Sequence, residues 1–284
     1  MKNLKKIILY GFDFLYLLKK NLEKAIFKKP SFCLRVLIYH DVKSKSQIEL
    51  FKNQILSLRK EYDFISPNEF EQLIRSKVKP NKKTILLTFD DGFKSNKKLA
   101  EQVLNELNIK ALFFIISDFI SLSKNSNEYN KIINNIYPNG PNKEELSKPM
   151  DMEDIKFLIS TGHQIGCHTR SHKKLSNLTC PNDLESEIIS SKIKLEEYLN
   201  INIKHFAFPF GTYESINKNS LKIISQNYKH IHSGLRGNNK NTSELIYRDA
   251  VNPEMKIIRL KSFLSGNADF FYKRKFNILK SYIN

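Results

Sequence analysis

Short apolar runs alternate with amphipathic segments along most of this chain. Runs rich in β-branched and aromatic residues predict strands at Cys33–Tyr39, Thr84–Phe89, Ala111–Ile116, Gln164–Cys167, His205–Pro209, Tyr228–His232 and Ile257–Leu260. Helical spacing of apolar residues predicts helices at Gln47–Lys60, Pro67–Ser76, Asn96–Leu107, Met152–Ser160, Asn182–Leu199 and Ser215–Gln226. Repeated strand–helix units imply an α/β fold with a mostly parallel sheet.

The N-terminal segment, residues 1–30, does not follow this alternation. Its lysines flank an apolar run at 7–18 that Asp13 interrupts, and no small-residue cleavage site follows. The run is also too short to span a bilayer. We predict a basic amphipathic helix, with residues 1–29 either lying on an anionic membrane surface or covering one end of the domain.

The rest of the chain divides into one α/β domain at residues 31–265 and a basic C-terminal tail at 266–284. Residues 117–150 form a long, asparagine-rich connection inside the domain. Long connections in compact domains are usually functional or mobile, so this one is interpreted as a substrate-binding lid or a disordered insertion.

The charge of the chain is strongly positive. Its 284 residues include 47 Lys and Arg against 29 Asp and Glu, a formal net charge of +18. Such a field favours anionic partners, but the lysines are spread along the chain and no nucleic-acid recognition motif is present. We expect an acidic glycan or a membrane surface and no nucleic acid; a lysine-rich proteome is the alternative explanation. The expected location is the cytoplasm or the periphery of the inner membrane.

Two adjacent carboxylates end one of the predicted strands. Asp90 and Asp91 follow the run 84–89 and precede Gly92. Neighbouring carboxylates repel one another and are costly to bury, so a bound cation is the simplest explanation for them. Such an ion would neutralise one carboxylate and leave the other free to act as a base. The alternative interpretation is an ordinary turn after a strand.

A pair of histidines completes a candidate metal site. His168 and His172 are four residues apart, so they share a face if the segment turns helically. With Asp91 they form a two-histidine, one-carboxylate set, which suits a divalent ion with open positions for water and substrate. We expect one divalent ion, with Zn²⁺ favoured over Co²⁺, Ni²⁺, Fe²⁺ or Mn²⁺.

Four motifs in this order resemble those of the polysaccharide deacetylases, the family of the NodB-homology domain, also called carbohydrate esterase family 4. They are L-I-Y-H-D-V at 37–42, T-F-D-D-G-F at 88–93, H-T-R-S-H at 168–172 and F-A-F-P-F-G-T-Y at 206–213. The resemblance implies a distorted (β/α)7-type barrel with mostly parallel strands and an active site at their carboxyl ends. It also implies a hydrolase of carbohydrate metabolism in the cell envelope, which removes N-acetyl groups from amino sugars of a polysaccharide or lipid-linked glycan.

The resemblance implies a mechanism for these residues. The metal held by Asp91, His168 and His172 activates a water molecule, and Asp90 takes the proton of this water as general base. The oxyanion is stabilised by the metal and by a backbone N–H, which by resemblance is that of Phe210. Pro209 and Tyr213 of the same motif are assigned to the substrate side of the site.

The chain departs from the common family pattern at the general acid. Many members supply this acid from a late L-x-H motif, but the corresponding region reads I-I-R-L at 257–260 and contains no histidine. His40, in the early motif, resembles the early histidine that has this role in the subgroup acting on exopolysaccharides. His230 and His232 are the alternatives.

A second departure concerns the residue that orients the base. An arginine often precedes the proline motif, whereas this chain has Ala207 and Phe208 there. Arg248 and Arg259 are the candidates to orient Asp90, and the sequence does not decide between them. Two other functions stay open: hydrolysis of another non-peptide amide, and a non-catalytic, membrane-docked glycan-binding module.

Overall fold

The computed structural model describes residues 10–18, 32–76, 82–140, 146–240 and 245–283. Its strands form one sheet in the order β8-β7-β6-β5-β4-β3-β1-β9, with β2 also paired to β3. Every strand pair is parallel. The strands are β1 Cys33–Tyr39, β2 Asp63–Phe64, β3 Lys83–Phe89, β4 Leu112–Ile115, β5 Gln164–Cys167, β6 His205–Ala207, β7 His230–His232, β8 Leu245–Ile246 and β9 Asp249–Ala250.

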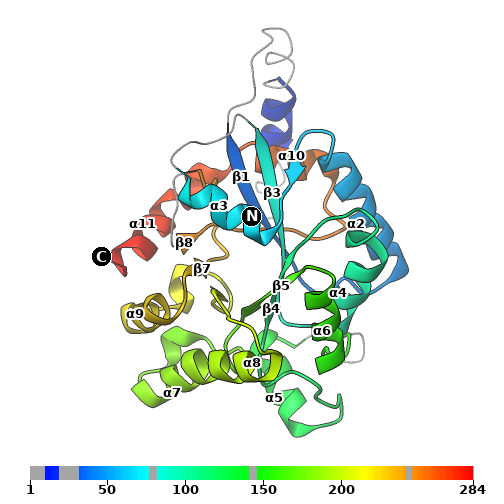
Figure 1. Ribbon diagram of the computed structural model, residues 1–284. Helices are drawn as coiled ribbons and strands as arrows, with labels where there is room; N and C mark the ends of the chain where they lie inside the picture. The colour runs from blue at the N-terminus through cyan, green and yellow to red at the C-terminus, as the bar shows by residue number, and fades with distance from the viewer. Residues whose placement is uncertain (1–9, 19–31, 77–81, 141–145, 241–244, 284) are drawn as a thin grey trace.

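The segment 245–250 joins the two edges of this sheet. Its first part, β8, pairs with β7, and its last part, β9, pairs with β1. The chain therefore passes from one edge to the other within a few residues and converts a curved parallel sheet into a distorted barrel, as Figure 1 shows. The predicted α/β barrel is confirmed.

Helices surround the strands on the outside (Figure 1). They are α2 Lys45–Leu58, α3 Pro67–Arg75, α4 Lys94–Leu99, α5 Asn127–Ile136, α6 Met152–Ser160, α7 Pro181–Glu185, α8 Ser191–Leu199, α9 Lys218–Asn227, α10 Ile257–Leu264 and α11 Lys273–Ser281. Short 3-10 turns lie at η3 Leu175–Asn177, η5 Tyr213–Ser215 and η6 Asp269–Tyr272, and π-helical turns extend α4 at η1 Ala100–Leu104 and α7 at η4 Ser186–Ser190. Within the described ranges, no helix combines the length and hydropathy needed to cross a bilayer.

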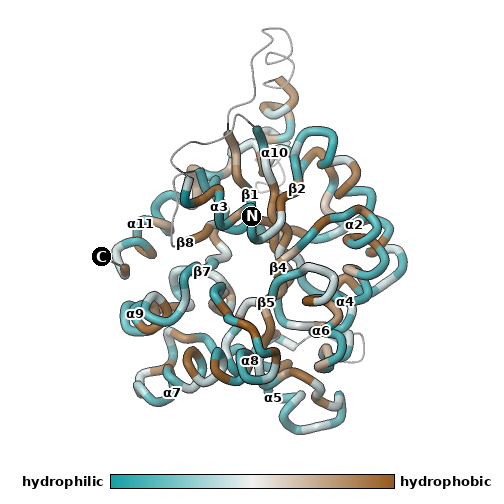
Figure 2. Tube along the Cα trace, viewed as in Figure 1, coloured by the Kyte–Doolittle hydropathy of each residue, from teal (hydrophilic) through white to brown (hydrophobic). Residues whose placement is uncertain are grey.

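The hydrophobic core has an outer and an inner part, because successive side chains of a strand point to opposite faces. The outer part lies between strands and helices and includes Leu37, Phe113 and Phe206. The inner part fills the barrel with smaller clusters, including Val36 and Leu86. Figure 2 accordingly shows the most hydrophobic stretches along the central strands and hydrophilic colouring over much of the surrounding helices.

The predicted strand at Ile257–Leu260 is wrong, because these residues begin helix α10. A four-residue apolar run is compatible with either structure, and here Leu260 and Leu264, four residues apart, are both buried as the inner face of a helix. The C-terminal segment 266–284 is not a free tail. Its helix α11 buries Phe276 and Leu279, and the Phe276 ring stacks on Tyr247 at 3.6 Å.

Residues 10–18 are helical and pack against the barrel by one face. The Asp13 carboxylate accepts a hydrogen bond from Arg259 Nη2 at 2.8 Å, and the Phe12 carbonyl accepts one from Ser262 Oγ at 3.0 Å. The remainder of residues 1–30 lies outside the described ranges. The packed face agrees with the alternative of a helix that covers one side of the domain.

Candidate metal and catalytic site

The two carboxylates lie where β3 ends. The Asp90 backbone N–H donates to the Tyr39 carbonyl at 3.0 Å, so the pairing of β3 with β1 continues up to Asp90. Asp91 and Gly92 then both have positive φ values, 75° and 88°. A left-handed conformation is unfavourable for a non-glycine residue, and such strain concentrates at functional sites. This sharp turn keeps both carboxylates buried at the rim.

The two histidines come from the loop that follows β5. His168 directly follows the strand, and its Nδ1 lies 2.7 Å from the Ala207 carbonyl of β6. His172 Nδ1 lies 3.3 Å from the Asn135 carbonyl. The segment between them is not helical; positive φ values at Thr169 and His172 bend it so that the two rings lie 4.9 Å apart.

Asp91 and the two histidines form a compact, buried set. Asp91 Oδ1 lies 3.6 Å from His168 Nε2 and 3.5 Å from His172 Nε2. Both Asp91 oxygens lack a hydrogen-bond partner among the described residues. Burial, with the charges of Asp90 and Asp41, raises the pKa of Asp91 well above its ordinary value, so an ionised Asp91 requires a cation beside it.

The protonation states of the two imidazoles also fit a cation beside Asp91. Since a backbone carbonyl faces each Nδ1, each Nδ1 carries the proton and donates it, which leaves the Nε2 lone pairs directed at Asp91. Burial lowers the pKa of His168 to about 4 and that of His172 well below its ordinary value, so both rings are neutral near pH 7. The donor set of two neutral imidazoles and one carboxylate fits Zn²⁺ or a similar divalent ion.

Asp90 has a different partner. Arg248 Nη1 donates to Asp90 Oδ1 at 2.7 Å, and Nη2 donates to Oδ2 at 3.0 Å. Burial raises the pKa of Asp90, but Arg248, His168 and His40 outweigh this effect and hold the pKa below its ordinary value. Asp90 is therefore ionised, and its Oδ2 lies 3.9 Å from His168 Nε2.

Arg248, and not Arg259, is the residue that braces Asp90. Its guanidinium is fixed by a further hydrogen bond from Nε to the Ser233 carbonyl at 2.9 Å and lies over the Phe114 ring. Arg259 instead pairs with Asp13 of the N-terminal helix. Of the two arginines that the sequence left open, only Arg248 reaches the site.

His40 follows β1 at the same rim. Its side chain reaches solvent. The protein atoms around the ring and the charge of Arg248 lower the pKa of His40, and the charge of Asp90 offsets only part of this effect. His230 and His232 lie elsewhere: both are buried in β7, and His232 Nε2 lies 3.0 Å from His205 Nδ1 inside the barrel. Of the three candidate acids, His40 alone is accessible beside Asp90.

The family model described as polysaccharide deacetylase matches residues 77–228, more than half of the chain. The chain belongs to the polysaccharide deacetylase family. The resemblance inferred from the four motifs is thus confirmed.

Individual relatives are more distant. The Bacillus subtilis protein YxkH, whose name assigns it provisionally to the polysaccharide deacetylases, is 26% identical over 198 residues, which cover 68% of this chain and 61% of that protein. The chain thus spans about three fifths of the length of this relative.

Two solved structures share the fold. The Streptococcus pyogenes deacetylase PplD, solved in complex with acetate, has a TM-score of 0.64 at 23% identity and covers 82% of this chain and 98% of its own. IcaB from Ammonifex degensii has a TM-score of 0.65 at 22% identity, with coverages of 82% and 99%.

The proline motif of this family member forms a tight turn beside the histidines. Pro209 is buried, while Phe210 is 41% exposed, has a φ of 63° and places its ring 5.1 Å from that of His172. Gly211 approaches Gly234 so closely that a Cβ at Gly211 would lie 2.3 Å from the Gly234 nitrogen. Tyr213 begins η5 and packs against the outer core, on the side of α11.

The described part of the insertion 117–150 is folded rather than disordered. Helix α5 has its own small hydrophobic core, formed with Phe93 and Phe119. Its Asn135 contacts the loop after β5, which carries His168 and His172, at two points. The Asn135 carbonyl faces His172 Nδ1, and the side-chain amide donates to the Ser171 carbonyl at 2.8 Å. Nothing in the sequence distinguishes Asn135 from the six other asparagines of this segment.

Asp41, the residue after His40, ties this insertion to the rim. One of its carboxylate oxygens accepts from Ser95 Oγ at 2.5 Å and the other from the Ser147 backbone N–H at 3.0 Å. The role is structural, although its charge also acts on Asp91.

Proposed function

We propose that this protein is a metal-dependent N-deacetylase acting on amino sugars of a polysaccharide or lipid-linked glycan. The observation that carries the proposal is the contrast between the two adjacent carboxylates. Asp91 is buried without a hydrogen-bond partner among the described residues, next to two neutral imidazoles, whereas Asp90 is held ionised by Arg248. One carboxylate is arranged to bind a cation and the other to accept a proton.

Asp91, His168 and His172 would hold the ion, which when bound supplies Lewis acidity to the reacting centre. Asp90 takes a proton from the attacking water, a role for which it must be ionised and correctly oriented. Arg248 meets both requirements, because its charge lowers the pKa of Asp90 and its two hydrogen bonds fix the carboxylate.

His40 is the proposed donor to the leaving amine. It reaches solvent beside Asp90, and the protein atoms around its ring together with Arg248 lower its pKa, so it is neutral in the resting protein near pH 7. A neutral imidazole must gain a proton before it can donate one. The proton that Asp90 takes from the water would pass on to His40, which then donates it to the leaving amine. The negative charge of the tetrahedral centre would be met by the backbone N–H of Phe210, in the turn against His172.

A membrane-surface role is a second, separable part of the proposal. On the helix 10–18, the side chains of Tyr10, Phe14, Leu15, Leu17 and Leu18 are exposed, and those of Phe270 and Phe271 are exposed beside Phe12. Exposed cations at Lys273, Arg274 and Lys275 follow directly in sequence. An apolar patch edged by basic residues fits an anionic lipid surface, which would place the enzyme peripherally at a membrane and near lipid-linked sugars.

Acetate release tests the activity. The metal-loaded protein is incubated with N-acetylated polysaccharides and with lipid-linked N-acetylated sugars, and free acetate is measured against the Asp90→Asn variant. The proposal is supported if the unchanged protein releases acetate from one of these substrate classes and the Asp90→Asn variant does not. Glycan binding without release would favour the non-catalytic module, and release only from other amides would favour a different hydrolase.

A further inference from the structure

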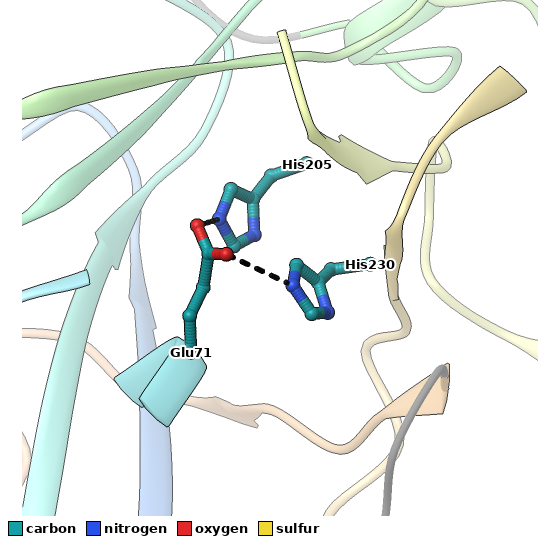
Figure 3. Close-up of side chains that lie close together, drawn as sticks. All are labelled: Glu71, His205 and His230. Atoms are coloured by element: carbon teal, nitrogen blue, oxygen red, sulfur yellow. Dashed lines mark hydrogen bonds and ion pairs between the residues drawn. The ribbon is translucent and has the colours of Figure 1, made fainter. Parts of the chain in front are cut away.

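A second group of buried metal-binding side chains lies at the other end of the barrel. His205 and His230 are the first residues of β6 and β7, and they are paired in register. Because the strands are parallel, this end is opposite the rim that carries Asp90 and Asp91. Glu71 of helix α3 reaches over both rings, as Figure 3 shows. The proposed deacetylation assigns no role to this group.

The spacing of the three side chains matches that of ligands around one ion. Glu71 Oε1 lies 3.4 Å from His205 Nε2, and Glu71 Oε2 lies 3.6 Å from His230 Nε2. One potential ligand atom from each residue lies within 4.8 Å of the others. These separations exceed the usual 2.7–3.2 Å of an N–H···O bond but are close to the edge of a zinc tetrahedron, about 3.3 Å for bonds of about 2.0 Å. They are also close to the oxygen–nitrogen distances of 3.5 and 3.6 Å in the Asp91, His168 and His172 set.

His230 is free to bind a metal, whereas His205 Nε2 lies within hydrogen-bonding distance of Glu71 Oε1, at 3.4 Å, and would exchange that contact for the ion. Both ring nitrogens of His230 are buried without a hydrogen-bond partner among the described residues. A buried polar atom without a hydrogen-bond partner costs folding free energy, and a bound ligand would remove that cost. Burial lowers the pKa of His230 to about 4, which leaves a neutral ring with a lone pair. His232 Nε2 lies 3.0 Å from His205 Nδ1 and can orient that ring from behind, as outer partners of metal-bound histidines do.

Three cations around Glu71 oppose metal binding. Arg75 Nη2 lies 3.1 Å from its carboxylate, Lys229 Nζ 3.5 Å and Lys204 Nζ 3.7 Å. Their side chains are about half exposed, at 53%, 44% and 45%, whereas Glu71, His205 and His230 are 7%, 1% and 2% exposed. The cations approach from the solvent side and can move away, although they make this group a weaker binder than the Asp91 set.

We propose that Glu71, His205 and His230 form a second site for a divalent transition-metal ion. Two imidazoles and one carboxylate favour Zn²⁺ or Co²⁺ over Mg²⁺ and Ca²⁺. The ion has a structural role, because it links helix α3 to two strands that are more than 130 residues away in sequence. It closes the barrel end that faces away from the substrate, and it does not depend on which reaction the other end performs.

Metal counting in the full-length protein tests the proposal. The double variant His168→Ala/His172→Ala removes the first set, and it is loaded with Co²⁺ or Zn²⁺, desalted and analysed by mass spectrometry for bound metal. We expect about two ions per chain in the unchanged protein and about one in the double variant, with the visible absorption of tetrahedral Co²⁺. Adding His230→Gln or Glu71→Gln to the double variant should remove the remaining ion.

The matched control is His163→Gln, another buried histidine outside both sets, which should not change the metal count in the double variant. A double variant that binds no Co²⁺ or Zn²⁺ while it keeps its circular dichroism spectrum would overturn the second site. Retention of the remaining ion after both Glu71→Gln and His230→Gln would also overturn it. A count of zero in the folded double variant decides against the second site even if these last substitutions prevent folding.

Discussion

Arg248 holds Asp90 by two parallel hydrogen bonds, of 2.7 Å and 3.0 Å, across 158 residues of sequence. Both side chains are almost fully buried. Two-point contact between a guanidinium and a carboxylate fixes orientation as well as charge, which a lysine could not do. Asp90, the proposed base, is therefore oriented by the segment that closes the barrel and not by its own motif.

Arg248→Met should slow turnover without emptying the metal site. Loss of the guanidinium removes the main attraction that lowers the pKa of Asp90, so the pKa rises and the acidic limb of the pH–rate profile moves to higher pH. We expect a loss in kcat of roughly 10- to 100-fold, the size typical of outer partners of active-site groups. Arg248→Lys should recover part of it. Arg259→Met, which breaks the other arginine–aspartate pair, is the control and should leave the pH profile unchanged.

The variants Asp90→Asn and Asp91→Asn should differ, because the proposal makes Asp90 the proton acceptor and Asp91 a metal ligand. Asp90→Asn should keep the bound metal and lose most turnover, because it removes only the proton acceptor. Asp91→Asn should lose metal affinity as well, since its oxygen faces both imidazoles. Metal content by mass spectrometry and acetate release are measured together; equal metal loss in both variants would contradict this division of roles.

His40→Ala should affect substrates unequally. If His40 protonates the leaving amine, amide hydrolysis slows by roughly 10²- to 10⁴-fold, the usual contribution of a general acid. An activated acetate ester has a leaving group that needs little protonation and should be much less affected. The measurement is the ratio of kcat/KM on the two substrates, and equal losses would assign His40 to substrate positioning or to the fold.

His163 should make the protein less stable in acid. Its Nδ1 accepts from the Ala111 backbone N–H at 3.0 Å, and burial with nearby Lys110 lowers its pKa from 6.5 to about 4. The unfolded chain therefore binds a proton that the folded chain does not, so the contribution to stability is complete above pH 6.5 and is lost as the pH falls toward 4. Urea unfolding at several pH values should show a smaller decline over this window for His163→Gln than for the unchanged protein.

The exposed apolar patch predicts lipid binding. Phe14→Glu/Leu17→Glu in the full chain should weaken sedimentation with anionic liposomes and leave acetate release from a soluble substrate unchanged. Leu50→Glu/Leu56→Glu on helix α2 places the same charges at exposed leucines away from the patch. If both pairs weaken binding equally, net charge alone explains the association and the patch has no specific role.

The strands that carry the site could be predicted because their patterns are unambiguous. Cys33–Tyr39 and Gln164–Cys167 have the bounds predicted from the sequence, since polar residues follow each run and mark where the buried strand ends. The meeting of Asp91, His168 and His172 also follows from the sequence, because parallel strands end at one rim. Their functional roles stay predictions.

The closing segment could not be predicted. β8 and β9 have two residues each and are separated by Tyr247 and Arg248, so neither length nor alternation distinguishes them from a loop. The choice between Arg248 and Arg259 depended on that segment. The contact between Asn135 and His172 could not be predicted either, because it is made by a backbone carbonyl, which every residue has.

The position of Arg248 within residues 245–250 has a consequence for biosynthesis. The metal-binding residues and Asp90 all leave the ribosome before Arg248 does. Until that arginine arrives, the lone carboxylate of Asp90 has no guanidinium to offset burial, so it cannot remain both ionised and enclosed. A nascent chain can therefore acquire its metal ligands before it acquires a working base. If Asp90 has the proposed role, hydrolysis would start only when residues 245–250 have joined the two edges of the sheet.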